Sequence, residues 1–306
     1  MQSITFRNRA WQTAANILFP ADFDSSKKYP AIVSVHPIGS CKEQTSGNIY
    51  GKALAEAGFV VLVIDASFQG ESGGEPRFIE DPTQRVEDIR YAVDYLVTLD
   101  YVDEARIGVL GVCGGGAYSL NAAMTERRLK AVVSITGVNF GRLLRDGFAG
   151  GSPIDTLEQI AAQRTAEARG QAVLVNDLLP ASVEAGRQAG ITDIDVLEAT
   201  DYYKTPRGQQ PNGATSAVFS RLSTGFGWDA FYLAEVLLTQ PILVVIGNKP
   251  GGFGAYRDGY EIVRRAASQN KTLLELDGVS HYELYDQPQA VGQALAKVIP
   301  FFQENL

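Results

Sequence analysis

Short apolar runs alternate with amphipathic segments along most of this chain. Continuous apolar runs rich in β-branched residues predict buried strands. Segments in which apolar residues recur every three or four positions, such as 83–99, predict helices. The predicted strands span 3–6, 13–19, 29–35, 59–64, 106–110, 129–135, 241–246 and 271–276, and the predicted helices 46–58, 83–99, 117–124, 154–169, 183–199 with an interruption at Gly190, 258–269 and 289–305.

The alternation stops between residues 137 and 240, where the pattern becomes helical, polar and rich in loops. Strands that alternate with helices on both sides of one long insertion predict an α/β protein with a doubly wound, mostly parallel sheet. We therefore expect residues 1–136 and 241–306 to form the α/β core. Residues 137–240 are expected to form an inserted helical cap.

Composition narrows the function classes. The chain has 306 residues, of which 45% are hydrophobic and 20% charged, as in an ordinary globular protein. Its net charge of −8 argues against a nucleic-acid or anionic-membrane partner. No apolar run could span a bilayer, and no signal peptide follows Arg7 and Arg9, so a cytoplasmic location is expected. A homo-oligomer is compatible with this composition.

Cysteine and histidine are both scarce. The two cysteines cannot build a disulfide framework, which fits a reducing compartment. The two histidines exclude a histidine-rich metal site, and we expect neither a metal nor a cofactor.

Cys113 lies in a Gly-x-Cys-x-Gly motif between the predicted strand 106–110 and the predicted helix 117–124. This strand–turn–helix context is that of the nucleophile elbow, with cysteine in place of serine. Gly111 and Gly115 fit a turn too tight for side chains beside the nucleophile. The amide of Gly114, at the helix start, is expected to face an oxyanion that forms beside the sulfur.

Two alternatives compete with this interpretation. A lone cysteine is often a small buried hydrophobe, although a packed strand end would not require glycines on both sides. Ser72 lies in a second motif of the form Gly-x-Ser-x-Gly, at residues 70–74. Residues 66–69 separate this motif from the preceding strand and no helix opens after it, so we interpret it as a turn.

His281 is the candidate base for the thiol, because imidazole commonly accepts the proton of such a nucleophile. It follows the last predicted strand, 271–276. The carboxyl ends of parallel strands share one edge of the sheet, so Cys113 and His281 can meet there. His36, in the loop after the strand 29–35, is interpreted as a structural residue.

These motifs together resemble the α/β-hydrolase superfamily, and within it dienelactone hydrolases and related hydrolases. The resemblance rests on His36-Pro37, on Asp65 with the 70–74 turn, on the elbow around Cys113 and on residues 278–281. It covers nearly the whole chain and implies an α/β-hydrolase fold. Dienelactone hydrolases also use a cysteine nucleophile, but they lack so long a cap.

The resemblance implies further site residues. An acid should follow the strand 241–246, but none stands there, and Asp258 is the nearest candidate to orient His281. The second oxyanion donor should be the amide of Ile38 or of Gly39. Glu43 could be the glutamate that dienelactone hydrolases place near the resting thiol, or simply a solvated loop charge. Cys41 could also approach the site.

The function expected from these residues is hydrolysis of an ester, lactone or thioester in a small-molecule substrate with an activated carbonyl. An acyltransferase, a peptidase of the X-Pro type and a ligand-binding protein with little turnover are the alternatives, because this scaffold hosts many functions. The aromatic residues Trp228 and Phe231 are expected either to line an apolar substrate pocket or to form the core of the cap.

Overall fold

An eight-stranded sheet forms the centre of the computed structural model, which describes residues 1–146 and 151–306. The strands follow the spatial order β1-β2-β4-β3-β5-β6-β9-β10. All pairs are parallel except those of β1 with β2 and of β2 with β4. The strands are β1 (Gln2–Asn8), β2 (Trp11–Leu18), β3 (Tyr29–Val35), β4 (Val60–Ile64), β5 (Val102–Val112), β6 (Leu129–Ile135), β9 (Ile242–Gly247) and β10 (Lys271–Leu276).

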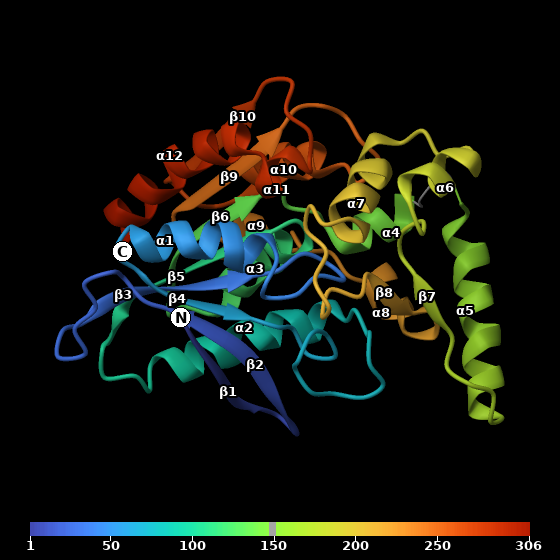
Figure 1. Cartoon of the computed structure of the whole chain (residues 1–306), viewed down its shortest axis with the longest axis horizontal. Coiled ribbons are helices and arrows are strands. Elements are labelled where there is room, and N and C mark those ends of the chain that lie inside the picture. The colour runs from blue at the N-terminus through green and yellow to red at the C-terminus, as the bar shows by residue number, and fades with distance from the viewer. Residues whose placement is uncertain (147–150) are drawn as a thin grey trace.

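Helices cover both faces of this sheet (Figure 1). The core helices are α1 (Lys52–Glu56), α2 (Pro82–Leu96), α3 (Gly114–Thr125), α10 (Ala255–Arg265), α11 (Glu283–Asp286) and α12 (Pro288–Asn305). The topology and the helix layers are those of an α/β-hydrolase fold, which confirms the expected fold class. None of the helices within the described residues is long and apolar enough to cross a membrane.

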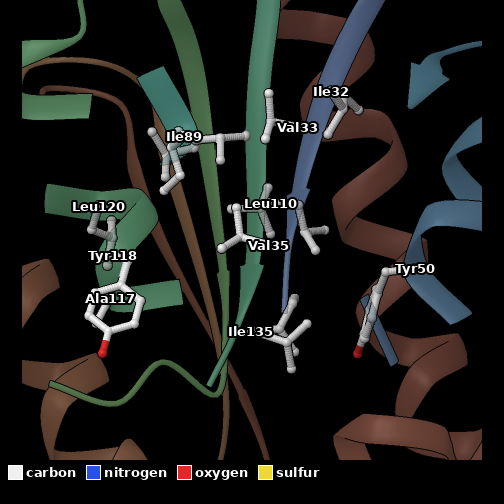
Figure 2. Close-up of a cluster of buried hydrophobic side chains, with 14 of the residues drawn as sticks. Ile32, Val33, Val35, Tyr50, Ile89, Leu110, Ala117, Tyr118, Leu120 and Ile135 are labelled. Atoms are coloured by element: carbon white, nitrogen blue, oxygen red, sulfur yellow. The ribbon is translucent and has the colours of Figure 1, made fainter. Parts of the chain in front are cut away.

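The central strands are buried on both faces, which explains their continuous apolar runs. Figure 2 shows Val35 and Leu110 in the middle of the core, with Tyr118 on one side of the strands and Tyr50 on the other. Both tyrosine side chains are fully buried. The buried strands hold the ends of β3, β5 and β6 in fixed positions, and the loops after them carry the candidate site.

The helix expected over 46–58 differs from the prediction. Its first half, η1 (Thr45–Gly51), is a π-helix, and only Lys52–Glu56 is α-helical. A side chain at Gly47 would place its Cβ 2.0 Å from the carbonyl oxygen of Lys42, so the backbone approaches this loop more closely than any other residue type permits. The wider turn follows from this close approach between two residues five apart in the chain, which the hydrophobic pattern does not report.

The described residues between β6 and β9 form the insertion. Most of them lie together at one side of the sheet (Figure 1), whereas the short helix Ala234–Leu237 (α9) packs against α3. The insertion holds more than the expected helices, because β7 and β8 pair as a short antiparallel sheet. Gly190 has a φ of +81° and separates α6 from α7, which confirms the expected interruption. Its elements are α4 (Phe140–Asp146), α5 (Pro153–Ala168), β7 (Val175–Asp177), α6 (Val183–Gln188), α7 (Ile194–Lys204), β8 (Ser216–Val218), η3 (Phe219–Arg221), α8 (Ser223–Phe226) and α9 (Ala234–Leu237).

A backbone hydrogen bond ties the insertion to the loop after β3. The amide of Thr215, just before β8, donates to the carbonyl oxygen of Gly39 at 2.9 Å. Both residues have positive φ angles, +50° for Thr215 and +65° for Gly39. The strand pair β7–β8 therefore rests on the loop that also carries Ile38.

The same loop carries a buried ammonium group, that of Lys42, which holds the loop in place through ion pairs. Lys42 Nζ lies 2.9 Å from Asp65 Oδ2, 2.7 Å from Glu43 and 2.5 Å from Glu71. The amide of Lys42 also donates to Asp65 Oδ1, at 2.8 Å. Lys42 and Asp65 are both excluded from solvent, so each depends on the other to compensate its buried charge.

Candidate active site

Cys113 occupies a sharp turn between β5 and α3. Its backbone has φ +55° and ψ −126°, a conformation that non-glycine residues rarely adopt. At Gly111 an added Cβ would lie 2.1 Å from the carbonyl oxygen of Gly115, and at Gly115 it would lie 2.4 Å from that of Val35. These two contacts explain the glycines of the motif, since no side chain fits there. The helix α3 begins at Gly114, three residues earlier than predicted, and directly after Cys113.

Three donors surround the sulfur of Cys113. The amides of Gly114 and Ile38 and the hydroxyl of Tyr285 are all within hydrogen-bonding reach of the thiol. Burial nevertheless raises the pKa of Cys113 to about 11, because desolvation disfavours the thiolate more than these donors favour it. The resting group is therefore a neutral thiol at pH 7, and it is 6% exposed.

The structure distinguishes the two amides expected as alternatives for the second oxyanion donor. The N–H of Ile38 lies near the sulfur and helps to lower the pKa of Cys113, whereas that of Gly39 acts on the buried carboxylate of Glu80 and lowers its pKa instead. A negatively charged oxygen beside the sulfur would thus find two backbone donors, from Ile38 and Gly114. That is the arrangement needed to stabilise a tetrahedral intermediate.

His281 lies between β10 and α11, on the same edge of the sheet as Cys113. Its Nδ1 is 2.9 Å from Thr136 Oγ1, and its Nε2 is 3.3 Å from the hydroxyl oxygen of Tyr285. Thr136 follows β6 with a φ of +44°, a strained backbone position. Burial lowers the pKa of His281 to about 3, so the ring is neutral at rest.

Tyr285 is a site residue that the sequence patterns did not reveal. Its hydroxyl contacts both the thiol of Cys113 and Nε2 of His281, and so joins the two groups. It lies four residues after His281, which places both side chains on one face of a helical turn. This spacing was the available signal, but tyrosine is too common a core residue for the spacing alone to be diagnostic.

Asp258 is not placed against His281 in the structure, so the expectation that it is the orienting acid is wrong. Its Oδ1 accepts from Arg142 Nε at 2.6 Å, and its Oδ2 accepts from the Asn139 amide at 2.8 Å and from Arg142 Nη2 at 2.8 Å. Both carboxylate oxygens are thus engaged in a buried ion pair. The helix α10 begins at Ala255, so Asp258 lies within its first turn and faces α4.

We expect Asp258→Asn to lower the stability of the protein and to spare its chemistry. Removing the buried carboxylate leaves Arg142 with Asp146 as its remaining carboxylate partner, at a cost of about 3 kcal/mol in the free energy of unfolding. Urea denaturation measures this loss. Asp146→Asn is the matched control, because Asp146 bonds the same arginine at the surface and should contribute less than about 1 kcal/mol. A large loss of turnover at unchanged stability would instead return Asp258 to the mechanism.

Glu43 and Cys41 are also placed differently from the expectation. The carboxylate of Glu43 pairs with Lys42 and lies beside the thiol of Cys41, and it is not among the groups around Cys113. Cys41 is fully buried, and desolvation raises its pKa. The pair therefore belongs to the buried cluster around Lys42.

An apolar cavity of about 70 Å³ opens over Cys113. Trp228 and Phe231 do not line it, so of the two expectations for these residues the pocket lining is wrong. Phe231 is buried core, and Trp228 packs on Tyr118 with ring centroids 5.4 Å apart. Side chains from both the core and the insertion, nearly all aliphatic or aromatic, form its wall instead. Besides Ile38 and Cys113 they are Val138, Phe140, Leu143, Leu178, Leu179, Tyr203, Thr215, Phe253, Tyr282 and Tyr285.

Residues 1–146 and 151–306 hold no group of three or more histidine, cysteine or acidic side chains arranged to bind a metal ion. The chemistry available to this site from the described residues is therefore that of a thiol, an imidazole, a phenol and two aimed backbone amides.

This fold and this elbow define the class of the protein, an α/β-hydrolase. The sequence profile of the PET hydrolase-like family matches residues 6–146, which supports a hydrolytic function in general. The chain is 40% identical to the uncharacterized protein YcjY of Escherichia coli, over 96% of this chain and 94% of that protein. It therefore belongs to the YcjY family of α/β-hydrolases.

One solved structure and one further sequence relative are also similar to this chain. The crystal structure of the hypothetical protein PA2218 of Pseudomonas aeruginosa superposes with a TM-score of 0.89 at 30% identity, covering 100% of this chain and 93% of that one. The thiohydrolase aneE of Aspergillus aculeatus is 26% identical over 72% of this chain and 69% of its own length. The particular likeness to dienelactone hydrolases stays a prediction.

Proposed function

We propose that this protein hydrolyses carboxylic esters, lactones or thioesters with an apolar acyl group, with Cys113 as the nucleophile. The observation that carries the proposal is the strained turn that holds the Cys113 sulfur against the amides of Ile38 and Gly114. Strain of this kind persists only where the surrounding structure maintains it, and it concentrates at functional sites.

The mechanism begins with attack of the Cys113 sulfur on the carbonyl carbon while the thiol proton moves to Nε2 of His281. The hydroxyl of Tyr285, which contacts both groups, can pass this proton on. The carbonyl oxygen becomes an oxyanion that accepts hydrogen bonds from Ile38 and Gly114. The tetrahedral intermediate then expels an alcohol or thiol, which takes the proton back from His281.

Water completes the cycle by attacking the thioester that links the acyl group to Cys113. His281 accepts a proton from this water, and the sulfur leaves and regains its proton. The products are a carboxylic acid and the free thiol. An acyltransferase would follow the same steps with another nucleophile in place of water.

The resting protonation state makes His281 a general base rather than half of an ion pair. The pKa of Cys113 is about 11 and that of His281 about 3, so neither group is charged near pH 7. Thiolate forms only as the sulfur attacks, as an alkoxide does at a serine nucleophile. Alkylation of this thiol should therefore be slow at neutral pH and accelerate toward alkaline pH.

The lining of the cavity supports the substrate class. Apolar side chains such as Leu143, Leu178 and Phe253 surround the sulfur, and none of the described residues that line the cavity carries a charge. An acyl group without charge fits such a wall, because burying an unpaired carboxylate or ammonium there is costly. The relative aneE is a thiohydrolase, which supports thioesters as members of the class.

The covalent intermediate tests the proposal. Intact-protein mass spectrometry during turnover of 4-nitrophenyl esters should show one added acyl group, and peptide mapping should place it on Cys113. Cys41→Ser is the matched control, because it removes the other thiol and should leave both the adduct and the turnover intact. Turnover without an adduct on Cys113 would contradict the proposal, and binding of an apolar ligand without any adduct would favour a binding protein.

A further inference from the structure

The place where an orienting acid was expected, directly after β9, holds no carboxylate of its own. Residues 248–252 are Asn, Lys, Pro, Gly and Gly. Two carboxylates from the insertion fill this place instead. Asp193 accepts from the amide of Gly252 at 2.7 Å, and Asp195 accepts from that of Phe253 at 2.8 Å.

Asp195 approaches this loop so closely that a side chain would not fit. A Cβ at Gly251 would lie 2.1 Å from Cγ of Asp195. Asp195 is 2% exposed, and only one of its oxygens is engaged: Oδ2 binds Phe253, while Oδ1 is buried without a hydrogen-bond partner among the described residues. An unpaired buried carboxylate oxygen is costly, so its retention needs a reason.

The side chain of Asp195, which carries the unpaired Oδ1, lines a small cavity together with His281 and Thr136. The cavity measures about 10 Å³, roughly the space of a single water molecule. Thr136 Oγ1 is already 2.9 Å from Nδ1 of His281. A threonine hydroxyl that accepts from Nδ1–H still has its own proton to donate, and a carboxylate is the natural acceptor.

From this geometry we infer that Asp195, carried by the insertion, is the positioning acid of His281, acting through Thr136 across the small cavity that the three residues share. The inference rests on the proposed function, since it assigns the missing member of that site. It also gives the insertion a role beyond covering the pocket, because the imidazole is then oriented only when α7 is in place.

The chemical benefit arises when His281 takes the thiol proton. The ring then carries a positive charge with N–H groups at both Nδ1 and Nε2. A carboxylate behind Thr136 stabilises this imidazolium without itself taking the proton. Burial alone opposes the charge, as the low pKa of His281 shows, so a compensating anion is what the site requires.

Ionisation of Asp195 should also affect how turnover depends on pH. Desolvation raises the pKa of Asp195 to about 7, so turnover should rise as the pH passes through this range and the group ionises. The measured value belongs to the coupled site rather than to one residue. The other titratable groups near Asp195 are Asp193 and Glu198 on its own element, and Cys113, Lys249, Tyr256, His281 and Tyr282 from the elements packed against it.

Asp195→Asn tests the inference, because the amide oxygen can still accept from Phe253 while the charge is lost. We expect kcat to fall about 100-fold with little change in KM, and the rise of activity near pH 7 to disappear. The Tm at pH 8 should increase, because ionisation of a carboxyl whose pKa is raised in the folded state destabilises that state. A purely structural aspartate would instead lower the Tm and leave the pH profile unchanged.

Asp193→Asn is the matched control, because Asp193 binds the same loop and asparagine is an equally good N-cap for α7. Its kcat should stay near that of the wild type. A second measurement, the alkylation rate of Cys113 by iodoacetamide in the Cys41→Ser background, should fall about tenfold in Asp195→Asn only. If both variants match the wild type in turnover and alkylation, the inference is overturned and the proposed function stands. If turnover survives Cys113→Ala, the proposed function fails, and the alkylation rates still decide the role of Asp195.

Discussion

Cys113→Ala is expected to reduce kcat/KM for activated esters at least about 1000-fold, since removing a nucleophile leaves only the contributions of substrate binding and of the oxyanion donors. Backbone donors from Ile38 and Gly114 remain in the variant, so weak residual hydrolysis by water is the expected floor. Steady-state kinetics with 4-nitrophenyl esters measures the loss. The circular dichroism spectrum should match that of the wild type, because alanine fits the space of the thiol.

Ser72→Ala is the informative control for this experiment. Ser72 lies in the second Gly-x-Ser-x-Gly motif, but its hydroxyl donates to the carbonyl of Asp65 and accepts from the amide of Ala14, both at 2.8 Å. The variant should lose about 1–2 kcal/mol of stability and retain its kcat. If Ser72→Ala were inactive and Cys113→Ala active, the nucleophile would have to be reassigned.

Lys42→Met is expected to destabilise the protein more than any of the other substitutions proposed above. It removes the ammonium from Asp65 while that carboxylate stays fully buried, which typically costs about 3–5 kcal/mol in the free energy of unfolding. Urea denaturation at pH 7 measures the loss. Lys52→Met is the control, because Lys52 is exposed on α1 and should change stability by less than about 0.5 kcal/mol.

A second substitution separates charge from packing in this cluster. Adding Asp65→Asn to Lys42→Met removes the uncompensated charge and should restore part of the lost stability. The amide of Lys42 would still find an oxygen acceptor at position 65, whereas the amide of Glu71, which binds the other carboxylate oxygen, would lose its acceptor, so the recovery is expected to be incomplete. If Lys42→Met proved as stable as Lys52→Met, the buried ion pair would have no net role in folding.

The order of the strands and helices could be predicted because burial is reflected in the sequence. Strands buried on both faces appear as continuous apolar runs, and helices buried on one face show apolar residues every three or four positions. The π-helix at Thr45–Gly51 could not be predicted, since it depends on the close approach of Gly47 to the carbonyl of Lys42, five residues earlier, which the spacing of hydrophobic residues does not encode. The strands β7 and β8 have three residues each and are too short to show any period.

The candidate site could likewise be predicted only in part. Local motifs and places at strand ends indicate Cys113, Gly114 and His281. Position in the chain favours Asp258, but its carboxylate binds Arg142, a partner 116 residues away. Asp195 lies in the insertion, far from any motif, and only the folded chain brings it to the cavity of His281.

The hydrogen bond from Thr215 to Gly39 has a mechanical consequence. Ile38 is the neighbour of Gly39, so a displacement of the strand pair β7–β8 pulls on the peptide whose amide points at the sulfur. An acyl chain that enters by displacing this strand pair would therefore move the amide that its carbonyl needs. Catalytic competence should return only when the strand pair is back in place over the bound chain.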